Sequence, residues 1–225
     1  MRGKVDVSII QADFDRLALF SREEWDHNSH YHSFLLKHVP PRCSNVLELG
    51  CGTGTFARLL AERAEHVLAL DLSPQMIRIA QERSGHLSNI DFQMADALAW
   101  EFPPEQFDCI VSIATLHHLP MEQMLIKMKA ALAPNGTLIV LDLFQESLSD
   151  MFTIMLAIPV NFVLKYLRTG RVRESQAARE ALAEHGQHDT YMSLSQLRQV
   201  CKTILPGARV KKHLLWRYSL IWKKR

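Results

Sequence analysis

A chain of 225 residues is long enough for one domain with a substantial buried core. Its residues are 48% apolar and 22% charged, as in ordinary globular proteins. A net charge of only +2 gives no electrostatic reason to expect nucleic-acid or membrane partners. Its four cysteines are far apart and form no CxxC pair, and no apolar signal run follows the opening Met-Arg-Gly-Lys-Val-Asp. These features predict a cytoplasmic protein with reduced thiols and no zinc or other metal site.

Residues 1–42 are expected to form helices that lead into the domain. They carry a polar cluster between Trp25 and His32, little more than a dozen residues before the first expected strand. On a helix, His27 and Tyr31 would share a face. A helix in this place can lie across a pocket at the edge of the sheet, and we expect His30 or Tyr31 to contact a ligand there. The alternative is a helix whose histidines cap and pack without chemistry.

Beyond these helices, short apolar runs alternate with stretches of helical pattern. Runs that are apolar throughout, each followed by a helix, are typical of a parallel sheet covered on both faces. Ser73 before Pro74 predicts the start of a helix, and Pro134-Asn135-Gly136 predicts the end of another. We therefore expect an α/β fold with a doubly wound, Rossmann-like sheet. The expected strands are 46–49, 67–71, 90–94, 109–113 and 137–143, and the expected helices are 56–64, 74–82 and 121–133.

Residues 145–192 interrupt this alternation with further helices. The first of them, 151–167, falls short of the roughly 20 apolar residues that a bilayer crossing needs. We expect it to act as a lid or as a homodimer helix, and we expect no stable membrane anchor. The whole chain, 1–225, is thus expected to be a single domain with an N-terminal helical cap (1–42) and a helical lid (145–192).

The last part of the chain is expected to return to the sheet. Ser193 and Gln196 have the spacing of a capping box and predict a helix over 193–204. Residues 209–223 have the pattern of a strand hairpin, although no strong turn signal lies inside this stretch.

The most informative segment is Val46-Leu-Glu-Leu-Gly-Cys-Gly-Thr-Gly-Thr-Phe56, a buried strand that runs through three glycines into a helix. Glycine permits close backbone approach, so a ligand can lie against Gly50, Gly52 and Gly54 at the carboxyl end of the strand. The spacing is GxGxG, whereas dinucleotide sites more often show GxGxxG around a pyrophosphate. The loop is therefore suited to a ligand that needs backbone access more than anion binding.

Two carboxylates follow at the ends of the next two strands. Asp71 stands 21 residues after Gly50, where a carboxylate can accept hydrogen bonds from both hydroxyls of a ribose. The alternative role, capping the following helix, already belongs to Ser73. Asp96 ends the third strand and is either a partner for an adenine amino group or an ordinary loop residue.

Six segments resemble, in their order, the motifs of class I S-adenosylmethionine-dependent methyltransferases. They are Glu48-Leu-Gly-Cys-Gly-Thr-Gly54, Asp71-Leu-Ser-Pro-Gln-Met76, Ala95-Asp96-Ala97, Phe107-Asp108, Leu116-His117-His118 and Leu132-Ala-Pro-Asn-Gly136. The resemblance is closest to the broad group that includes ubiquinone-pathway and natural-product enzymes. It implies a seven-stranded sheet with an antiparallel last strand. It also implies in-line methyl transfer from S-adenosylmethionine to a small molecule, with S-adenosylhomocysteine as the product.

The resemblance further implies which residues hold the cofactor. The glycine loop would border its methionine portion, with Glu48 orienting the loop and Ile113 offering backbone to the amino group. Asp71 would bind the ribose, its neighbours would pack near the adenosine, and residues after the third strand would meet the adenine. The expected set is Glu48, Gly50, Cys51, Gly52, Asp71, Leu72, Met76, Asp96, Ala97 and Ile113.

The acceptor side rests on chemistry rather than on a motif. Alignment of donor and acceptor can supply roughly 7–11 kcal/mol, and a general base adds about 10²–10⁴-fold where a proton must leave the acceptor. Histidine suits that task near neutral pH. The candidate catalytic residues are His30, Tyr31 and His118, with His117 also at the active edge. His185 and His188 lie in the insertion, where they either face the acceptor or belong to a solvated loop.

Two other functions compete with methyl transfer. A nicotinamide-dependent oxidoreductase would show GxGxxG and a Tyr-x-x-x-Lys pair, and the chain has neither. A binding partner or sensor protein that keeps the cofactor pocket without catalysis would carry the same motifs. Nucleic acid is disfavoured as a substrate because the basic residues lack interleaved aromatics.

Overall fold

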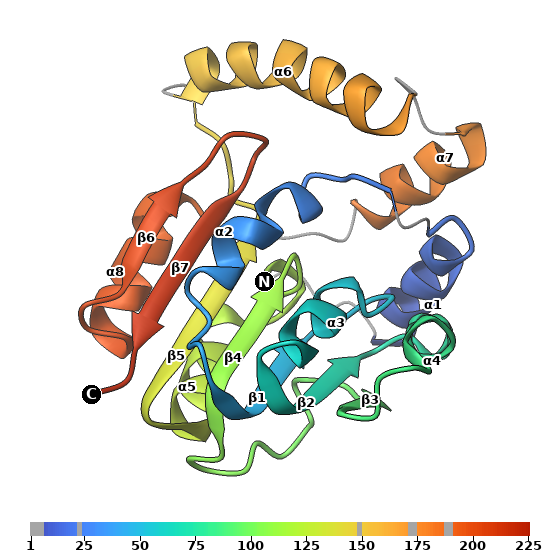
Figure 1. Cartoon of the computed structure of the whole chain (residues 1–225). Helices are drawn as coiled ribbons and strands as arrows, with labels where there is room; N and C mark the ends of the chain where they lie inside the picture. Colours follow the sequence, from blue (N-terminus) through green and yellow to red (C-terminus); the bar gives the residue numbers. More distant parts are fainter. Residues whose placement is uncertain (1–6, 22–23, 148–149, 171–174, 187–190) are drawn as a thin grey trace.

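The computed structural model describes residues 7–21, 24–147, 150–170, 175–186 and 191–225. These residues form a seven-stranded sheet in the order β3-β2-β1-β4-β5-β7-β6 (Figure 1). β1 to β5 are parallel, and β7 runs antiparallel to both of its neighbours. The expected Rossmann-like fold is thereby confirmed. The strands are β1 Cys43–Leu49, β2 Ala64–Asp71, β3 Ile90–Met94, β4 Phe107–Ile113, β5 Leu132–Asp142, β6 Arg209–Lys212 and β7 Tyr218–Lys223.

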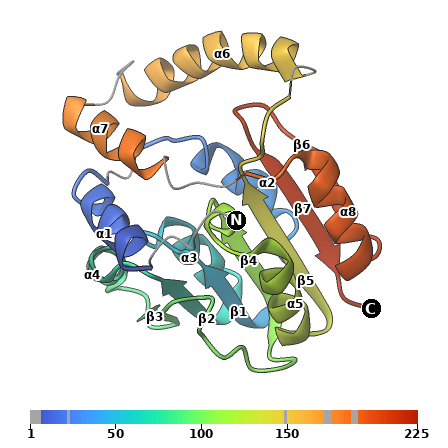
Figure 2. The same ribbon diagram turned by 180° about the vertical axis from the view of Figure 1, so that it is seen from behind.

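Helices cover both faces of this sheet, which explains why its central strands are apolar throughout. α3 (Thr55–Ala61) and α4 (Pro74–Ser84) lie on one face, together with α2 (His32–Leu36) (Figure 1). α5 (Met121–Ala131) and α8 (Leu194–Ile204) lie on the other (Figure 2). Consecutive residues of one strand therefore enter different cores.

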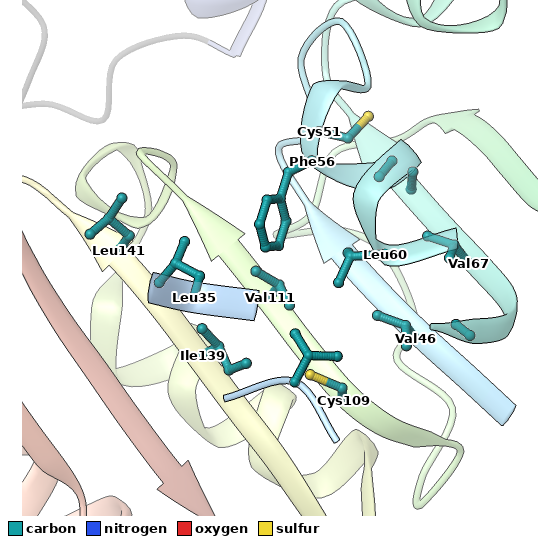
Figure 3. Close-up of a cluster of buried hydrophobic side chains, with 14 of the residues drawn as sticks. Leu35, Val46, Cys51, Phe56, Leu60, Val67, Cys109, Val111, Ile139 and Leu141 are labelled. Carbon is teal, nitrogen blue, oxygen red and sulfur yellow. The ribbon is translucent and has the colours of Figure 1, made fainter. Parts of the chain in front are cut away.

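The two cores can be followed along β1 and β4. Val46 packs in the first core with Phe56 and Leu60 of α3 (Figure 3), whereas the next residue, Leu47, packs in the second. Burial of such a side chain contributes roughly 1.5–3 kcal/mol. The central strands are thus held from both sides, and their carboxyl ends form a rigid edge for a site.

Two expected helix ends differ from the structure. α5 ends at Ala131 because Leu132 is already extended and pairs with Phe107 of β4. Pro134-Asn135-Gly136 therefore lies within β5, where the register with β4 shifts and Asn135 has a φ of 64°. The prediction that this tripeptide ends the helix was wrong, since strand pairing takes over two residues before it. Similarly, α3 ends at Ala61, so that β2 can begin at Ala64.

The polar cluster near the N-terminus is also less helical than expected. α1 (Val7–Ala18) is followed by a short 3₁₀ helix, η1 (Ser29–Tyr31), and then by α2. His27 precedes η1, so it does not share a helix face with Tyr31. Instead, His27 Nε2 lies 2.7 Å from Asn161 Oδ1, and the Tyr31 hydroxyl donates to the Leu214 carbonyl.

The insertion between β5 and α8 holds α6 (Met151–Thr169) and α7 (Gln176–His185). Its two ends lie side by side, because Gln145 N–H donates to the Met192 carbonyl at 2.9 Å and Gln145 forms a bridge with Ser193. α7 packs against α1, and α6 lies as an outer layer beyond the carboxyl ends of the parallel strands (Figures 1 and 2). None of the described helices is long and apolar enough to cross a membrane.

Candidate active site

The glycine loop joins β1 to α3 and contacts the end of β2. Gly50, Gly52 and Gly54 all have positive φ, at 71°, 52° and 75°. A Cβ on Gly50 would lie 1.9 Å from Thr115 Oγ1, and one on Gly54 would lie 2.9 Å from the Phe92 ring. A Cβ on Gly52 would have no atom of the described residues within 4 Å. Packing thus requires two of the glycines, whereas the third presents bare backbone to open space.

Asp71 connects this loop to the start of α4. Its Oδ2 accepts the Gly52 N–H at 2.8 Å, and its Oδ1 accepts the Ser73 N–H at 2.9 Å. Burial raises the pKa of Asp71, and the two hydrogen bonds oppose that rise. Ser73 is the N-cap of α4 and accepts the Met76 N–H at 3.1 Å, as expected from its place before Pro74. Asp71 is therefore held by backbone donors at the end of its strand.

Glu48 lies directly below the loop and is only 2% exposed. Burial, followed by the neighbouring Asp71 charge, raises the pKa of Glu48 well above its usual range. Among the described residues its buried Oε2 has no hydrogen-bond partner. An unpaired buried polar atom costs about 1–3 kcal/mol, so this carboxyl group is suited to a ligand that completes its hydrogen bonding.

These residues line one cavity of about 940 Å³ at the carboxyl edge of the sheet. Its volume lies in the range typical of small-molecule sites. Phe14 of α1 and Asn28, Ser29 and His32 of the N-terminal segment line it from above. The expected cofactor residues among its lining are Glu48, Gly50, Cys51, Gly52, Asp71, Leu72, Met76 and Ile113.

Asp96 and Ala97 do not line this cavity. They follow β3, next to β2 in the sheet, and Asp96 Oδ1 accepts the Leu98 N–H at 2.8 Å. The Ala95 N–H donates to the Asp71 carbonyl, so the two strand ends are directly connected. The structure thus brings eight of the ten expected cofactor residues together and leaves this pair beside them.

A family model described as a methyltransferase domain matches residues 46–136. This span runs from β1 into β5 and contains the glycine loop, Asp71 and Ile113. This match, the methyltransferase relatives and the shared fold support a class I S-adenosylmethionine-dependent methyltransferase. The enzyme class expected from the motifs is confirmed, and S-adenosylmethionine is the cofactor of this family.

Known relatives of this methyltransferase differ in what their names say they act on. An uncharacterised methyltransferase from Mycobacterium bovis is 29% identical over 202 residues, which cover 89% of this chain and 98% of the relative. Trans-aconitate 2-methyltransferase from Streptomyces avermitilis is 38% identical over 122 residues, 50% of this chain and 45% of that enzyme. The structure of N-methyltransferase NodS from Bradyrhizobium japonicum with S-adenosyl-L-homocysteine has the same fold, with a TM-score of 0.59, 19% identity and coverage of 96% and 98%.

The candidate catalytic residues of the methyltransferase lie outside the lining of the cavity. His30 is exposed beside Trp25 and Tyr31. Tyr31 is buried, its hydroxyl is bonded to the Leu214 carbonyl, and burial raises its pKa to about 12. His118 lies in a ring cluster, with centroids 5.4 Å from Phe14 and 4.8 Å from His185. His188 lies outside the described residues.

Asp142, which ends β5 and is fully buried, belongs to none of the motifs that pointed to the site. Its carboxylate accepts the backbone N–H groups of His117 and Leu143, at 3.1 and 2.8 Å, and lies 2.6 Å from His117 Nδ1. The His117 ring in turn stacks on Tyr191, near the end of the insertion. An available signal was the position of Asp142, since it ends an apolar strand just as Asp71 does.

Arg217 is a second residue that the motifs did not indicate. It is buried just before β7, and its Nε donates to Asn28 Oδ1 at 2.8 Å. Burial lowers its pKa, while the charges of Asp142 and Asp26 oppose that shift. Arg217 therefore supports Asn28, and with it one wall of the cavity. No sequence signal at this position distinguishes it from a surface arginine.

Within the described part of the chain, no three histidine, cysteine or acidic side chains lie close enough together to hold a metal ion.

Proposed function

We propose that this enzyme transfers the methyl group of S-adenosylmethionine to a small-molecule acceptor and that the cavity at the glycine loop holds the cofactor. The observation that carries the proposal is the bare backbone of Gly52 between two buried carboxyl groups, Glu48 and Asp71, in that one cavity. When bound, the cofactor supplies a methyl carbon activated by its sulfonium.

The donor set fits the polar groups of this cofactor. S-adenosylmethionine carries ribose hydroxyls and an ammonium group, all of which donate hydrogen bonds, and Glu48 and Asp71 offer acceptors. Leu72 and Met76 would supply apolar contact to the adenosine, and the Ile113 carbonyl would accept from the ammonium. Asp96 and Ala97, at the neighbouring strand end, would meet the adenine.

The acceptor would enter beside the cofactor, beneath α1, α6 and α7, which we propose as its cover. A small molecule suits a cavity of this size. The relatives named as malonyl-[acyl-carrier protein] and trans-aconitate methyltransferases act on different acceptors, so they support the reaction rather than one substrate. Of the three base candidates we favour His118, because its ring packs against Phe14, which lines the cavity, whereas Tyr31 is engaged through its hydroxyl and His30 is exposed.

The proposal is tested by titrating the protein with S-adenosylmethionine and with S-adenosylhomocysteine in a calorimeter. Hydrogen bonds to a charged group contribute about 1.5–3 kcal/mol each. Replacing Asp71 by Asn should therefore weaken cofactor binding by about 10–100-fold. Asp108→Asn is the matched control, because Asp108 also accepts two backbone N–H groups, from Ser44 and Asn45 at 2.7 and 3.0 Å, but lies at the opposite end of the sheet.

The outcomes of these titrations, together with a screen of acceptors, test the proposed site and activity. Binding that Asp71→Asn weakens and Asp108→Asn leaves unchanged supports the cofactor site. If neither ligand binds, or if both variants bind as the wild type does, the proposed site is wrong. A mass increase of one methyl group in an acceptor screen then separates an enzyme from a silent binding protein.

A further inference from the structure

One wall of the cavity has a buried arginine behind it. Arg217 is only 7% exposed, and its Nε donates to Asn28 Oδ1 at 2.8 Å. Because a guanidinium has donors and no acceptor, the atom that it contacts is the amide oxygen of Asn28, and the amide nitrogen is turned to another side. Asn28 itself lines the cavity, and its Nδ2 donates to none of the described residues. The contact with Arg217 thus leaves the NH₂ group of Asn28 open to a ligand.

The charge of Arg217 is not paired within the described part of the chain. Its other hydrogen bond goes to the Trp216 carbonyl at 3.4 Å, and it forms no ion pair with a described residue. Asp142 and Asp26 act on it only over a longer distance. Asp26 is exposed, so water and salt screen its charge. A buried charge is costly unless an opposite charge lies beside it, and this wall is therefore suited to an anionic group.

The place of this wall in the fold relates it to one end of the cavity. Arg217 immediately precedes β7, and β7 pairs with β5, which lies next to β4. Asn28 leads through η1 into α2, whose Leu35 lies over β5 (Figure 3). The contact therefore stands on the β4 side of the glycine loop, where Ile113 ends its strand. Asp71 lies on the other side of the loop, at the end of β2.

We propose that Asn28, oriented by Arg217, binds the carboxylate of S-adenosylmethionine in this enzyme. The inference rests on the proposed function, in which the cavity holds this cofactor with its methionine portion toward Ile113. The ribose hydroxyls and the ammonium of the cofactor donate hydrogen bonds, but its carboxylate only accepts them, so the acceptors that Glu48 and Asp71 offer do not serve it. Asn28 Nδ2 supplies a donor, and the buried charge of Arg217 supplies the attraction. Arg217 acts through Asn28 and is therefore a positioning residue.

Other donors in the lining of the cavity serve other partners. The Ser29 and Thr115 hydroxyls donate to backbone carbonyls three and two residues away. Arg58 and Arg83 lie on α3 and α4, which pack on β2 and β3, and both donate to backbone carbonyls there. These two arginines are thus on the Asp71 side of the glycine loop. An amide with a buried positive charge behind it distinguishes the β4 side.

Titration calorimetry with three ligands tests the inference. Decarboxylated S-adenosylmethionine keeps the sulfonium and the ammonium but lacks the carboxylate, and 5′-methylthioadenosine lacks the whole amino-acid portion. The wild type should bind S-adenosylmethionine at least about tenfold more tightly than the decarboxylated analogue. Asn28→Asp removes the donor and adds a like charge, so it should abolish this preference and change the affinity for methylthioadenosine by less than about twofold. Arg217→Gln should reduce the preference about tenfold, and Arg217→Lys, which keeps a charge, should restore part of it.

The matched controls are Asn161→Asp and Arg209→Gln. Asn161 Oδ1 lies 2.7 Å from His27 Nε2 and so connects α6 to the segment that carries Asn28, whereas Arg209 is exposed on β6. Neither residue lines the cavity. Both controls should keep the wild-type preference for S-adenosylmethionine over its decarboxylated analogue.

The inference is supported by a preference that Asn28→Asp abolishes, that Arg217→Gln reduces and that both controls keep. A wild type that binds the two ligands equally overturns it, and this comparison needs no variant, so it holds even where Arg217→Gln fails to fold. A preference that survives in Asn28→Asp overturns it as well. Either result leaves the proposed function standing if Asp71→Asn still weakens all three ligands, whereas a wild type that binds none of them contradicts both.

Discussion

The three glycines of the loop differ in what a side chain would meet. Gly50 and Gly54 are enclosed by Thr115 and by Phe92, so their lack of a side chain serves the fold. Gly52 is enclosed by nothing within 4 Å, and its N–H is held by Asp71. The backbone of Gly52 is therefore open to the approach of a ligand. The same motif thus contains two glycines that packing requires and one that it does not, and spacing alone does not separate them.

Gly52→Ala should accordingly damage binding more than stability. The methyl group enters open space, so the fold bears only the strain of a positive φ, roughly 1–2 kcal/mol, while the cofactor loses its closest approach to the backbone. We expect a small decrease in melting temperature and at least a tenfold loss of S-adenosylmethionine affinity by calorimetry. Gly170→Ala is the control, since Gly170 also has a positive φ, 69°, and a Cβ there would meet none of the described residues within 4 Å. Equal affinities in the two variants would contradict a binding role for Gly52.

Which residues line the cavity at the glycine loop was largely predictable, since eight of the ten expected cofactor residues meet there. The strands, the glycine loop and the acids follow one another in a fixed order. Because the carboxyl ends of parallel strands meet at one edge of the sheet, motif residues that are distant in the sequence become neighbours there. The acceptor side was not predictable in this way. The Tyr31 hydroxyl donates a hydrogen bond to the carbonyl of Leu214, 183 residues away, and Arg217 donates one to Asn28, 189 residues away. Contacts between such distant segments leave no local pattern.

At the scale of helices and strands, a short sequence pattern predicted an element correctly where the hydrogen bonds that define it join residues close together in the sequence. The capping box predicted for α8 is present: Gln196 N–H donates to Ser193 Oγ at 3.3 Å, and Ser193 N–H donates to Gln196 Oε1 at 2.9 Å. Both partners lie within about one turn, so four residues of sequence contain the whole interaction. This cap also orients α8, whose Leu197 and Cys201 enter the second core.

Ser193→Ala should destabilise the protein by about 1 kcal/mol, because the Gln196 N–H at the start of α8 loses its acceptor. For a chain of this length that corresponds to a decrease of about 2–4 °C in melting temperature, measurable by scanning calorimetry. Ser193→Asp keeps an acceptor oxygen and should restore most of the loss. If the alanine and aspartate variants melt alike, the hydrogen bonds of the cap do not stabilise α8.

The connection between β6 and β7 shows where local signals failed. The turn is made by Leu215 and Trp216, both with φ near 59°, a conformation that favours glycine and asparagine. Leu215 is fully buried and Trp216 packs against the first core. Burial of these side chains offsets the backbone strain, so the turn contains none of the residues by which turns are recognised. The same competition between tertiary contacts and local pattern ends α5 before Pro134.

At the scale of the whole molecule, the cap, the insertion and the last hairpin meet above the sheet. His27 joins η1 to α6, Tyr31 joins it to the hairpin turn, and α1 packs on α7. Several histidines lie in this upper layer, and burial lowers the pKa of His27, His30, His32 and His213. The lowered pKa values favour the neutral form of these four imidazoles.

The clearest case is His213, whose pKa is lowered to about 4 by burial and then by the Lys211 charge. Its Nε2 lies 2.8 Å from Ser219 Oγ, and its ring lies beside Tyr31 and Phe34. The unfolded chain protonates this histidine near its ordinary value of about 6.5, whereas the folded chain does so only near pH 4. Between these values the unfolded state binds more protons, so stability contributed by His213 is complete above pH 6.5 and is lost as the pH falls toward 4.

His213→Gln should remove this dependence, because glutamine keeps polar atoms for a hydrogen bond but does not titrate. We expect its melting temperature, relative to wild type, to rise progressively from pH 7 to pH 4, as the wild type loses the contribution of its neutral histidine. His66→Gln, at an exposed position of β2, is the control and should follow the wild-type curve throughout. Parallel curves for His213→Gln and wild type across this range would show that His213 is protonated at the same pH in the folded and unfolded chain. The upper layer would then have to tolerate a charged imidazole beside Lys211, against what the burial of this ring implies.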